Sequence, residues 1–155
     1  IAMPETPRKI MAIASGGGHW VQMRRLKPVF EGAEVFYVSI DPSSAVEVPG
    51  HRYYTVRDAT RRDRAAFAVL IAQLTRILWR ERPAVVVTTG AAPGLLALAL
   101  GKWLFGARTI WIDSVANAEQ LSSSGAQAHR VADVWLTQWE HLTRPEGPHF
   151  WGSVL

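Results

Sequence analysis

A run of glycines separates an apolar segment from a stretch with helical spacing. Residues 10–14 are apolar, residues 20–30 have helical spacing, and between them lies Ser15-Gly16-Gly17-Gly18-His19. A strand that passes through glycines into a helix places free backbone N–H groups at the helix N-terminus, where they can bind a phosphate. His19 adds a side chain of the type that gains or loses a proton near neutral pH. The alternative is a glycine turn needed only for tight packing of strand and helix.

Segments of strand and helix character alternate along the rest of the chain. Apolar and β-branched stretches predict strands at residues 9–14, 34–40, 52–56, 84–88, 109–113 and 134–137. Periodic apolar residues predict helices at 20–30, 63–82 and 94–104, and another near 125–131, whereas 143–149 is expected to be a loop. This order favours a parallel sheet with right-handed crossovers. At 155 residues we expect a single Rossmann-like α/β domain.

Composition narrows the partners of this domain. The net charge of +4 is concentrated in residues 1–82, which hold 13 Lys and Arg against 8 Asp and Glu, and this suits an anionic ligand or surface. No recognised nucleic-acid motif is present, so nucleic acid is not an expected partner. The absence of cysteine excludes disulfides and thiolate metal sites. The scattered histidines give no metal-ligand spacing, so no metal is expected. No cofactor is expected in the main interpretation reached below.

A membrane-spanning or secretory segment is not expected, because no apolar run reaches the roughly 18–20 residues that a spanning helix needs. The longest candidate is residues 93–105, interrupted by Lys102. Its large apolar side chains cover more than one helix face: Leu95, Leu96, Leu98, Trp103, Leu104 and Phe105. We therefore hypothesise peripheral membrane contact through residues 94–105 and nearby basic residues. The alternative is a helix buried on both sides.

Two further loops are expected at the carboxyl end of the sheet, where ligands bind at the point of strand-order reversal. The strand at 84–88 is followed by Thr89 and Gly90, which either flank the ligand crevice or form an ordinary turn. The strand at 109–113 is followed by a polar cluster, which contains Asp113, Ser114, Asn117 and Glu119. Asp113 and Glu119 are candidate acid–base groups or ligands of sugar hydroxyls. The alternative is that the cluster supplies N-caps and turn formers for the next helix.

Standard nucleotide motifs are incomplete or absent. Gly16 and Gly18 match the first two positions of the dinucleotide motif G-x-G-x-x-G, but Val21 stands where the third glycine belongs. Asp41 ends the second predicted strand, where it could contact a ribose, so an NAD(P)-binding domain remains an alternative. The sequence contains neither a phosphate-binding G-x-x-x-x-G-K-[ST] loop nor the G-x-S-x-G turn of hydrolases.

Six short motifs together resemble those of one family. They are Ala-Ser-Gly-Gly-Gly-His at 14–19, Thr-Thr-Gly-Ala-Ala-Pro at 88–93, Ile-Asp-Ser at 112–114, Ser-Ser-Ser-Gly at 122–125, Ala-Asp at 132–133 and Gln-Trp-Glu at 138–140. Their order and spacing resemble the PssD-type proteins of bacterial capsule and exopolysaccharide synthesis. These proteins are similar to the membrane-recruiting subunit of the two-part UDP-GlcNAc transferase that extends dolichol-linked glycans.

The resemblance implies the N-terminal, acceptor-binding half of an inverting GT-B glycosyltransferase, related to the one-chain enzyme MurG and split over two polypeptides. This half would bind a polyprenyl-pyrophosphate-linked glycan, and a PssE-like partner would bind the UDP-sugar. By the same resemblance, His19 is the candidate general base and Gly16, Gly17 and Gly18 lie near the pyrophosphate. The transmembrane anchor of the dolichol-pathway subunit is lacking in this sequence. Membrane attachment would then be peripheral, through the partner chain, or through sequence outside these 155 residues. The implied location is cytoplasmic, peripheral at the inner face of the plasma membrane.

The partner chain needs a surface to bind. Trp139 and Trp151 look exposed in the sequence, and Trp151 and Gly152 lie in the apolar end at 150–155. The alternative for Trp151 is that it covers the core of its own domain. Tryptophan is enriched at protein interfaces, so these three residues are the predicted contacts. Another interpretation is a non-catalytic scaffold that places a catalytic chain at the membrane. The scaffold interpretation differs from that of an acceptor-binding glycosyltransferase half only in whether His19 or another residue takes part in the chemistry.

Overall fold

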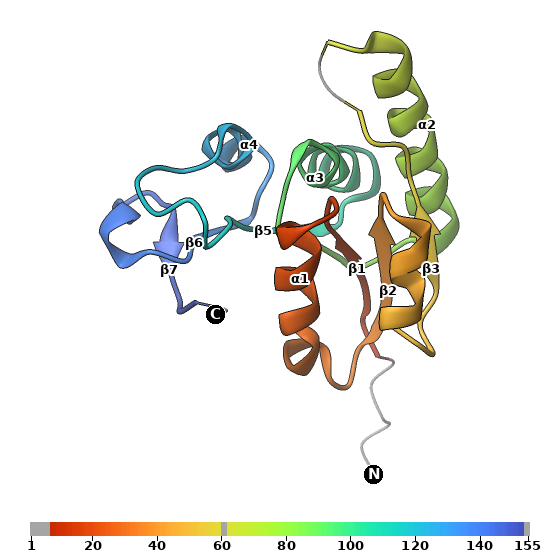
Figure 1. Ribbon diagram of the computed structural model, residues 1–155, viewed down its shortest axis with the longest axis horizontal. Helices are drawn as coiled ribbons and strands as arrows, with labels where there is room; N and C mark the ends of the chain where they lie inside the picture. Colours follow the sequence, from red (N-terminus) through yellow and green to blue (C-terminus); the bar gives the residue numbers. More distant parts are fainter. Residues whose placement is uncertain (1–6, 60–61, 154–155) are drawn as a thin grey trace.

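Parallel strands form one seven-stranded sheet in the order β3-β2-β1-β4-β5-β6-β7 (Figure 1). The computed structural model describes residues 7–59 and 62–153. The strands are β1 (Lys9–Ile13), β2 (Glu34–Ser39), β3 (Tyr53–Thr55), β4 (Val85–Thr88), β5 (Arg108–Ile112), β6 (Val134–Thr137) and β7 (His149–Phe150). The order extends from β1 toward β3 on one side and from β4 toward β7 on the other. It therefore reverses between β1 and β4, where open α/β sheets form a ligand crevice.

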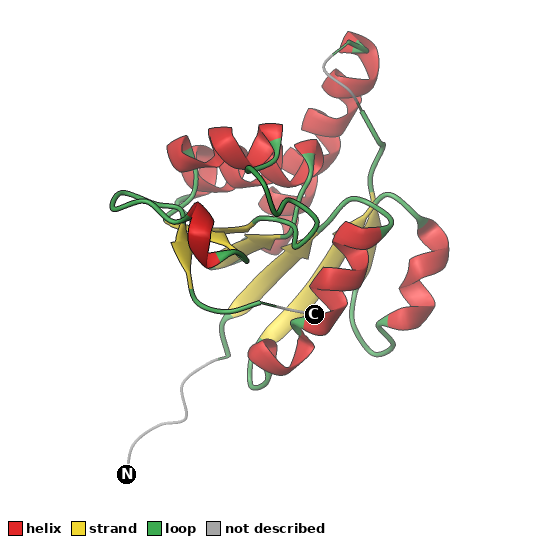
Figure 2. Ribbon diagram, turned by 60° about the vertical axis from the view of Figure 1, so that its left-hand side comes forward, coloured by secondary structure: helices red, strands yellow, loops and turns green. Residues whose placement is uncertain are grey.

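Helices cover both faces of the sheet (Figure 2). The helices are α1 (Gly18–Arg25), α2 (Arg64–Glu81), α3 (Ala92–Phe105) and α4 (Ser123–Gln127). Strand β1 shows how the two layers are built, because its side chains from Met11 to Ile13 point to alternate faces and are all buried. Met11 and Ile13 belong to the core cluster that contains Leu70 and Leu74 of α2. Ala12 belongs to the opposite cluster, with residues of α1. Burial on both faces explains the continuous apolar strands of the sequence.

Capping residues fix the ends of the long helices. The Asp63 carboxylate accepts a hydrogen bond from the Ala66 N–H (3.0 Å) at the start of α2, and this satisfies a free donor of the first turn. Helix α2 ends before Pro83, with Arg82 in the left-handed conformation (φ 48°). Helix α3 has Pro93 in its first turn, and Gly106 follows its last residue. The predicted helix boundaries at 63–82 and 94–104 thus agree closely with the structure.

Three predicted segments differ from the structure. The predicted helix at 20–30 ends at Arg25 and continues only as a 3-10 turn over Lys27–Phe30, because Pro28 cannot donate a backbone hydrogen bond. Strand β7 pairs in parallel with Leu136 and Thr137 of β6. Its first residue, His149, was predicted to be the last residue of the loop at 143–149. The helix predicted near 125–131 starts earlier, as α4, and ends in a 3-10 turn at 128–130. Val154 and Leu155, the end of the predicted apolar segment, lie outside the described residues.

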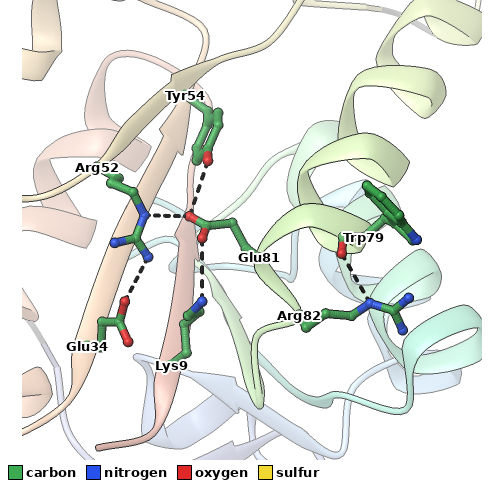
Figure 3. Close-up of polar contacts among 7 residues, drawn as sticks. All are labelled: Lys9, Glu34, Arg52, Tyr54, Trp79, Glu81 and Arg82. Atoms are coloured by element: carbon green, nitrogen blue, oxygen red, sulfur yellow. Dashed lines mark hydrogen bonds and ion pairs between the residues drawn. The ribbon is translucent and has the colours of Figure 1, made fainter.

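A charged cluster joins the amino ends of the first strands to the end of α2 (Figure 3). The Glu81 side chain, 7% exposed, accepts hydrogen bonds from Arg52 Nε (2.7 Å) and the Tyr54 hydroxyl (3.2 Å) and pairs with Lys9 Nζ (3.5 Å). Arg52 also pairs with Glu34 (2.9 Å). Burial raises the pKa of the Glu81 carboxyl, but the hydrogen bond and charge of Arg52 and the charge of Lys9 outweigh it, so the pKa lies below its ordinary value. The cluster is at the opposite end of the sheet from the crevice, so its role is structural.

Candidate functional site

The glycine loop after β1 and the loop after β4 lie side by side at the crevice. The Ser15 N–H donates to the Gly90 carbonyl (2.9 Å), and the Thr89 hydroxyl donates to the His19 carbonyl (2.6 Å). The His19 ring nitrogen Nδ1 is 3.0 Å from the Thr89 carbonyl. Two segments 70 residues apart in sequence are thus joined by backbone and side-chain hydrogen bonds. The topology brings together the two loops that the sequence predicted to flank the crevice.

The hydrogen bond at Nδ1 fixes the tautomer of His19. A carbonyl oxygen can only accept a hydrogen bond, so Nδ1 must carry the proton that lies between it and the Thr89 carbonyl. In the neutral ring, Nε2 then has no proton and offers a lone pair. The side chain is half-buried and lines a hollow of about 340 Å³. A ring in this protonation state has the lone pair that a general base needs, so the arrangement is compatible with the predicted role of His19.

Gly90 is required for this position of the His19 ring. Its φ of 121° lies in a region that L side chains rarely adopt. A Cβ atom added at residue 90 would also lie 2.7 Å from Nδ1 and 2.8 Å from Cε1 of His19, closer than carbon atoms in proteins approach. Any side chain here would therefore displace the imidazole ring. The closeness of the His19 ring thus explains why residue 90 is a glycine.

Two helix N-termini open onto the crevice without side-chain caps. Helix α1 begins after Gly17 and helix α3 after Ala91; neither cap residue makes a side-chain hydrogen bond, and neither first turn contains an acidic residue. The free N–H groups of such a turn carry a partial positive charge. Between them lies a hollow of about 660 Å³, which we call the glycine-loop hollow. Its lining includes the two loops and one acidic side chain, Asp58, and comprises Ser15, Gly16, Gly17, Ile40, Asp58, Ala59, Ala91, Ala92, Pro93 and Ser124. An anion placed here would face both helices.

The hollow that contains His19 is lined by polar side chains, and we call it the serine hollow. Its lining includes Thr89, Gly90, Ser114, Asn117, Ser122, Ser123 and Ser124. Hydroxyl and amide groups both donate and accept hydrogen bonds, which suits the hydroxyls of a sugar. Ala91 and Ser124 line both hollows, so the serine hollow and the glycine-loop hollow adjoin.

Asp113 organises the loop around the serine hollow. Its side chain is buried, and its carboxylate oxygens accept hydrogen bonds from Trp111 Nε1 (3.1 Å), Asn117 Nδ2 (3.3 Å), and the hydroxyl (2.7 Å) and N–H (3.1 Å) of Ser122. Ser122 in turn is the N-cap of α4. These hydrogen bonds are those of a turn former, and Asp113 also lines the serine hollow, so its role as an acid–base group or ligand of sugar hydroxyls stays a prediction. Glu119 is exposed and does not line either hollow.

Two buried glutamines were missed by the sequence analysis. Gln22 Nε2 of α1 donates to the Ser114 hydroxyl (2.9 Å), and Gln138 Nε2 lies 2.6 Å from Gln22 Oε1 and 2.9 Å from the Asp113 carbonyl. Together they attach α1 to the loop that lines the serine hollow. The available signal for Gln22 was a polar residue between Trp20 and Met23 on a buried helix face. Gln138 lay in one of the motifs that carried the resemblance.

The predicted partner contacts differ in exposure. Trp151 is 73% exposed, and with Gly152 it borders an apolar hollow of about 320 Å³ over the sheet face. The other apolar side chains around this hollow are Leu26, Val29, Phe30, Val87, Ile110, Ile112 and Leu136. Trp139 is only partly exposed, and its Nε1 donates to the Val115 carbonyl (2.7 Å). Trp139 therefore also stabilises the loop of its own chain.

Within the part of the chain that the structure describes, we compared the sequence predictions for a metal site, a membrane-spanning helix and a ribose contact with the structure. Over residues 7–59 and 62–153, no cluster of His, Asp and Glu is placed to hold a metal ion. Within the same ranges, no helix is both long and apolar enough to cross a bilayer. The Asp41 carboxylate, considered for a ribose, accepts hydrogen bonds from the N–H (2.9 Å) and hydroxyl (2.7 Å) of Ser43. These bonds hold the turn that follows β2.

No protein-family model and no curated protein matches this sequence. Solved structures nevertheless share its fold. Acinetobacter baumannii MurG aligns with a TM-score of 0.69 at 16% identity, over 92% of this chain and 43% of MurG. UDP-N-acetylglucosamine 2-epimerase from Rickettsia bellii aligns with a TM-score of 0.64 at 17% identity, over 88% of this chain and 40% of the epimerase. A glycosyltransferase from Rickettsia africae aligns with a TM-score of 0.61 at 11% identity, over 87% and 37%.

These alignments define the architecture. The chain spans about two fifths of the length of each of these proteins. It has the Rossmann-like α/β fold of one half of a GT-B enzyme, as the sequence predicted. The more specific resemblance to PssD-type proteins stays a prediction from the motifs.

Proposed function

We propose that this chain is the acceptor-binding and membrane-recruiting subunit of a two-component inverting glycosyltransferase. The observation that carries the proposal is the pairing of two uncapped helix N-termini with a hydroxyl-lined hollow that contains His19. The first feature suits a diphosphate, and the second suits the sugar attached to it. Together they fit a polyprenyl-pyrophosphate-linked glycan of exopolysaccharide or capsule synthesis.

In the proposed reaction, a hydroxyl of the acceptor sugar attacks the anomeric carbon of a UDP-sugar held by the partner chain. The new carbon–oxygen bond forms on the face opposite UDP, and the bond to UDP breaks with its electron pair leaving on the diphosphate. The hydroxyl proton moves to Nε2 of His19, which is free to accept it because Nδ1 donates to the Thr89 carbonyl. Free N–H groups of α1 and α3 hold the acceptor diphosphate in place.

The partner subunit is proposed to bind at the apolar hollow bordered by Trp151 and Gly152. Val29, which is 73% exposed, also lines this hollow and adds to the exposed apolar surface. Parallel sheets are normally covered on both faces, and a donor-binding chain would provide the missing cover. Large exposed tryptophans are the residues that contribute most at such interfaces.

Membrane recruitment is proposed to use the outer surface of α2 and α3. Trp79, Trp103 and Leu104 are 64%, 66% and 61% exposed, and the first two are suited to the membrane–water interface. Arg76 and Arg80 are also exposed on α2, where they line a hollow together with Tyr54 and Thr55 of β3. The sequence has no Asp or Glu from residue 64 to residue 80 or within α3. A basic, tryptophan-bearing surface of this kind suits an anionic bilayer. Figure 3 shows Trp79 near the end of α2, where its carbonyl accepts from Arg82 Nε (3.1 Å).

The test is reconstitution with a PssE-like donor-binding chain. Transfer from a UDP-sugar to a polyprenyl-pyrophosphate-linked acceptor is measured with each chain alone and with the two together. The proposal expects product only from the pair. A pair that assembles and transfers equally well with His19→Ala would support the scaffold alternative. Saturable NAD binding by this chain would support the dinucleotide alternative.

A further inference from the structure

An apolar groove adjoins the glycine-loop hollow. It has a volume of about 220 Å³ and lies among α2, α3 and the α4 region. Its lining is mostly apolar or aromatic and comprises Phe67, Ala92, Leu95, Leu96, Ala99, Trp103 and Val131, together with Gln127 and Arg130. Ala92 lines both the groove and the glycine-loop hollow, so the two adjoin at the start of α3.

The three hollows follow one another in a definite chemical order. The serine hollow shares Ala91 and Ser124 with the glycine-loop hollow, which shares Ala92 with the groove. A molecule that crosses this surface would meet hydroxyl groups and His19, then free backbone N–H groups, and then apolar side chains. A sugar, a diphosphate and a hydrocarbon chain have the same order in a lipid-linked glycan. This match of order selects a hydrocarbon chain attached to the diphosphate as the occupant of the groove.

We propose that the groove binds the first isoprenoid units of the acceptor lipid, next to the diphosphate. This inference rests on the proposed function and adds a lipid-binding subsite to it. The groove follows α3 from Ala92 to Trp103, a distance of about 16 Å at 1.5 Å per residue. Trp103 and Leu104 are exposed at its far end, on the surface proposed to meet the membrane. The remaining lipid would therefore leave the groove directly into the bilayer.

The expected effect on affinity follows from buried hydrocarbon. Each methylene removed from water increases affinity about fourfold, so even partial burial of the chain gives at least about a tenfold gain. The chain should therefore bind farnesyl diphosphate at least about tenfold more tightly than inorganic diphosphate, in buffer without membranes or detergent. Inorganic diphosphate measures the glycine-loop hollow alone, and the difference between the two ligands measures the groove.

Isothermal titration calorimetry with both ligands tests the proposal on the wild-type chain and on Ala99→Phe. Phenylalanine at residue 99 fills the groove from the face of α3 that lines it, so the tenfold preference should be lost while diphosphate binding stays unchanged. Ala72→Phe adds the same ring at an exposed position of α2 and should keep the preference. Leu96→Gln, which makes the groove polar without filling it, provides a second variant. Circular dichroism melting curves identify any variant that fails to fold.

The outcomes separate this inference from the proposed function. Equal affinity for the two ligands, or a preference that survives in both Ala99→Phe and Leu96→Gln, overturns the groove as a lipid site. Diphosphate binding and sugar transfer would then still stand. Failure of the wild-type chain to bind either ligand, together with no transfer by the reconstituted pair, overturns the proposed function itself.

Discussion

Replacement of His19 by alanine gives the sharpest separation between a structural and a chemical role for this residue. The structural contribution is small, because the side chain makes one hydrogen bond, from Nδ1 to the Thr89 carbonyl, at a half-buried position. Loss of such a bond costs about 1 kcal/mol of unfolding free energy. Loss of a general base lowers the rate about 10²–10⁴-fold, which corresponds to about 2.7–5.4 kcal/mol in the barrier. The effect on transfer should thus clearly exceed the effect on stability.

His51 provides a matched control within the same chain. Its Nδ1 makes an equivalent contact, 3.0 Å from the Val35 carbonyl, near the amino end of β2 and away from the crevice. His51→Ala should lose a similar amount of stability in urea unfolding and leave transfer unchanged. The assay is single-turnover transfer by the chain reconstituted with its donor-binding partner, with the UDP-sugar that the wild-type pair uses. If His19→Ala, like His51→Ala, transfers sugar at the wild-type rate, the general-base argument is refuted.

Four further changes test other parts of the account. Gly90→Ala should lower transfer about as strongly as His19→Ala, because the added Cβ displaces the imidazole ring; an unchanged rate would contradict the steric argument. Glu81→Gln should cost about 2 kcal/mol of unfolding free energy at pH 7. Because the pKa of Glu81 is lowered in the folded chain, the difference from wild type should shrink as the pH falls below 4.5. A difference that stays constant in urea unfolding across that range would contradict a stabilising role for the Glu81 charge. Trp151→Ala should weaken assembly with the partner by roughly 2 kcal/mol in a titration of the two chains without lowering the melting temperature, and unchanged affinity would move the interface elsewhere. The double change Arg76→Glu and Arg80→Glu should abolish sedimentation with anionic liposomes at low salt, and full retention would exclude this surface as the membrane contact.

The position of the crevice could be predicted from the sequence because it depends on local signals and on topology. Glycines after β1 and after β4 end apolar strands, and a parallel sheet places the carboxyl ends of neighbouring strands at one edge. The contact between His19 and Thr89 follows from that arrangement. The motifs themselves, however, did not distinguish a site for a diphosphate from a tight turn.

Long-range polar contacts could not be predicted in the same way. Gln22 and Gln138 are 116 residues apart and meet only in the folded chain. The role of Asp113 depends on Ser122, nine residues later, which folds back onto its carboxylate. Strand β7 is only two residues long, so it has no alternation for a pattern to detect. These features depend on tertiary packing and not on local sequence.

The central claim is that this chain binds the lipid-linked acceptor and leaves the nucleotide-sugar to another chain. The most direct measurement is calorimetric titration of the purified chain with farnesyl-diphosphate-linked N-acetylglucosamine, with UDP-N-acetylglucosamine and with NAD. The account predicts saturable binding of the first ligand and no saturable heat with the other two. Tight binding of UDP-N-acetylglucosamine or NAD, without binding of the lipid-linked sugar, would contradict it.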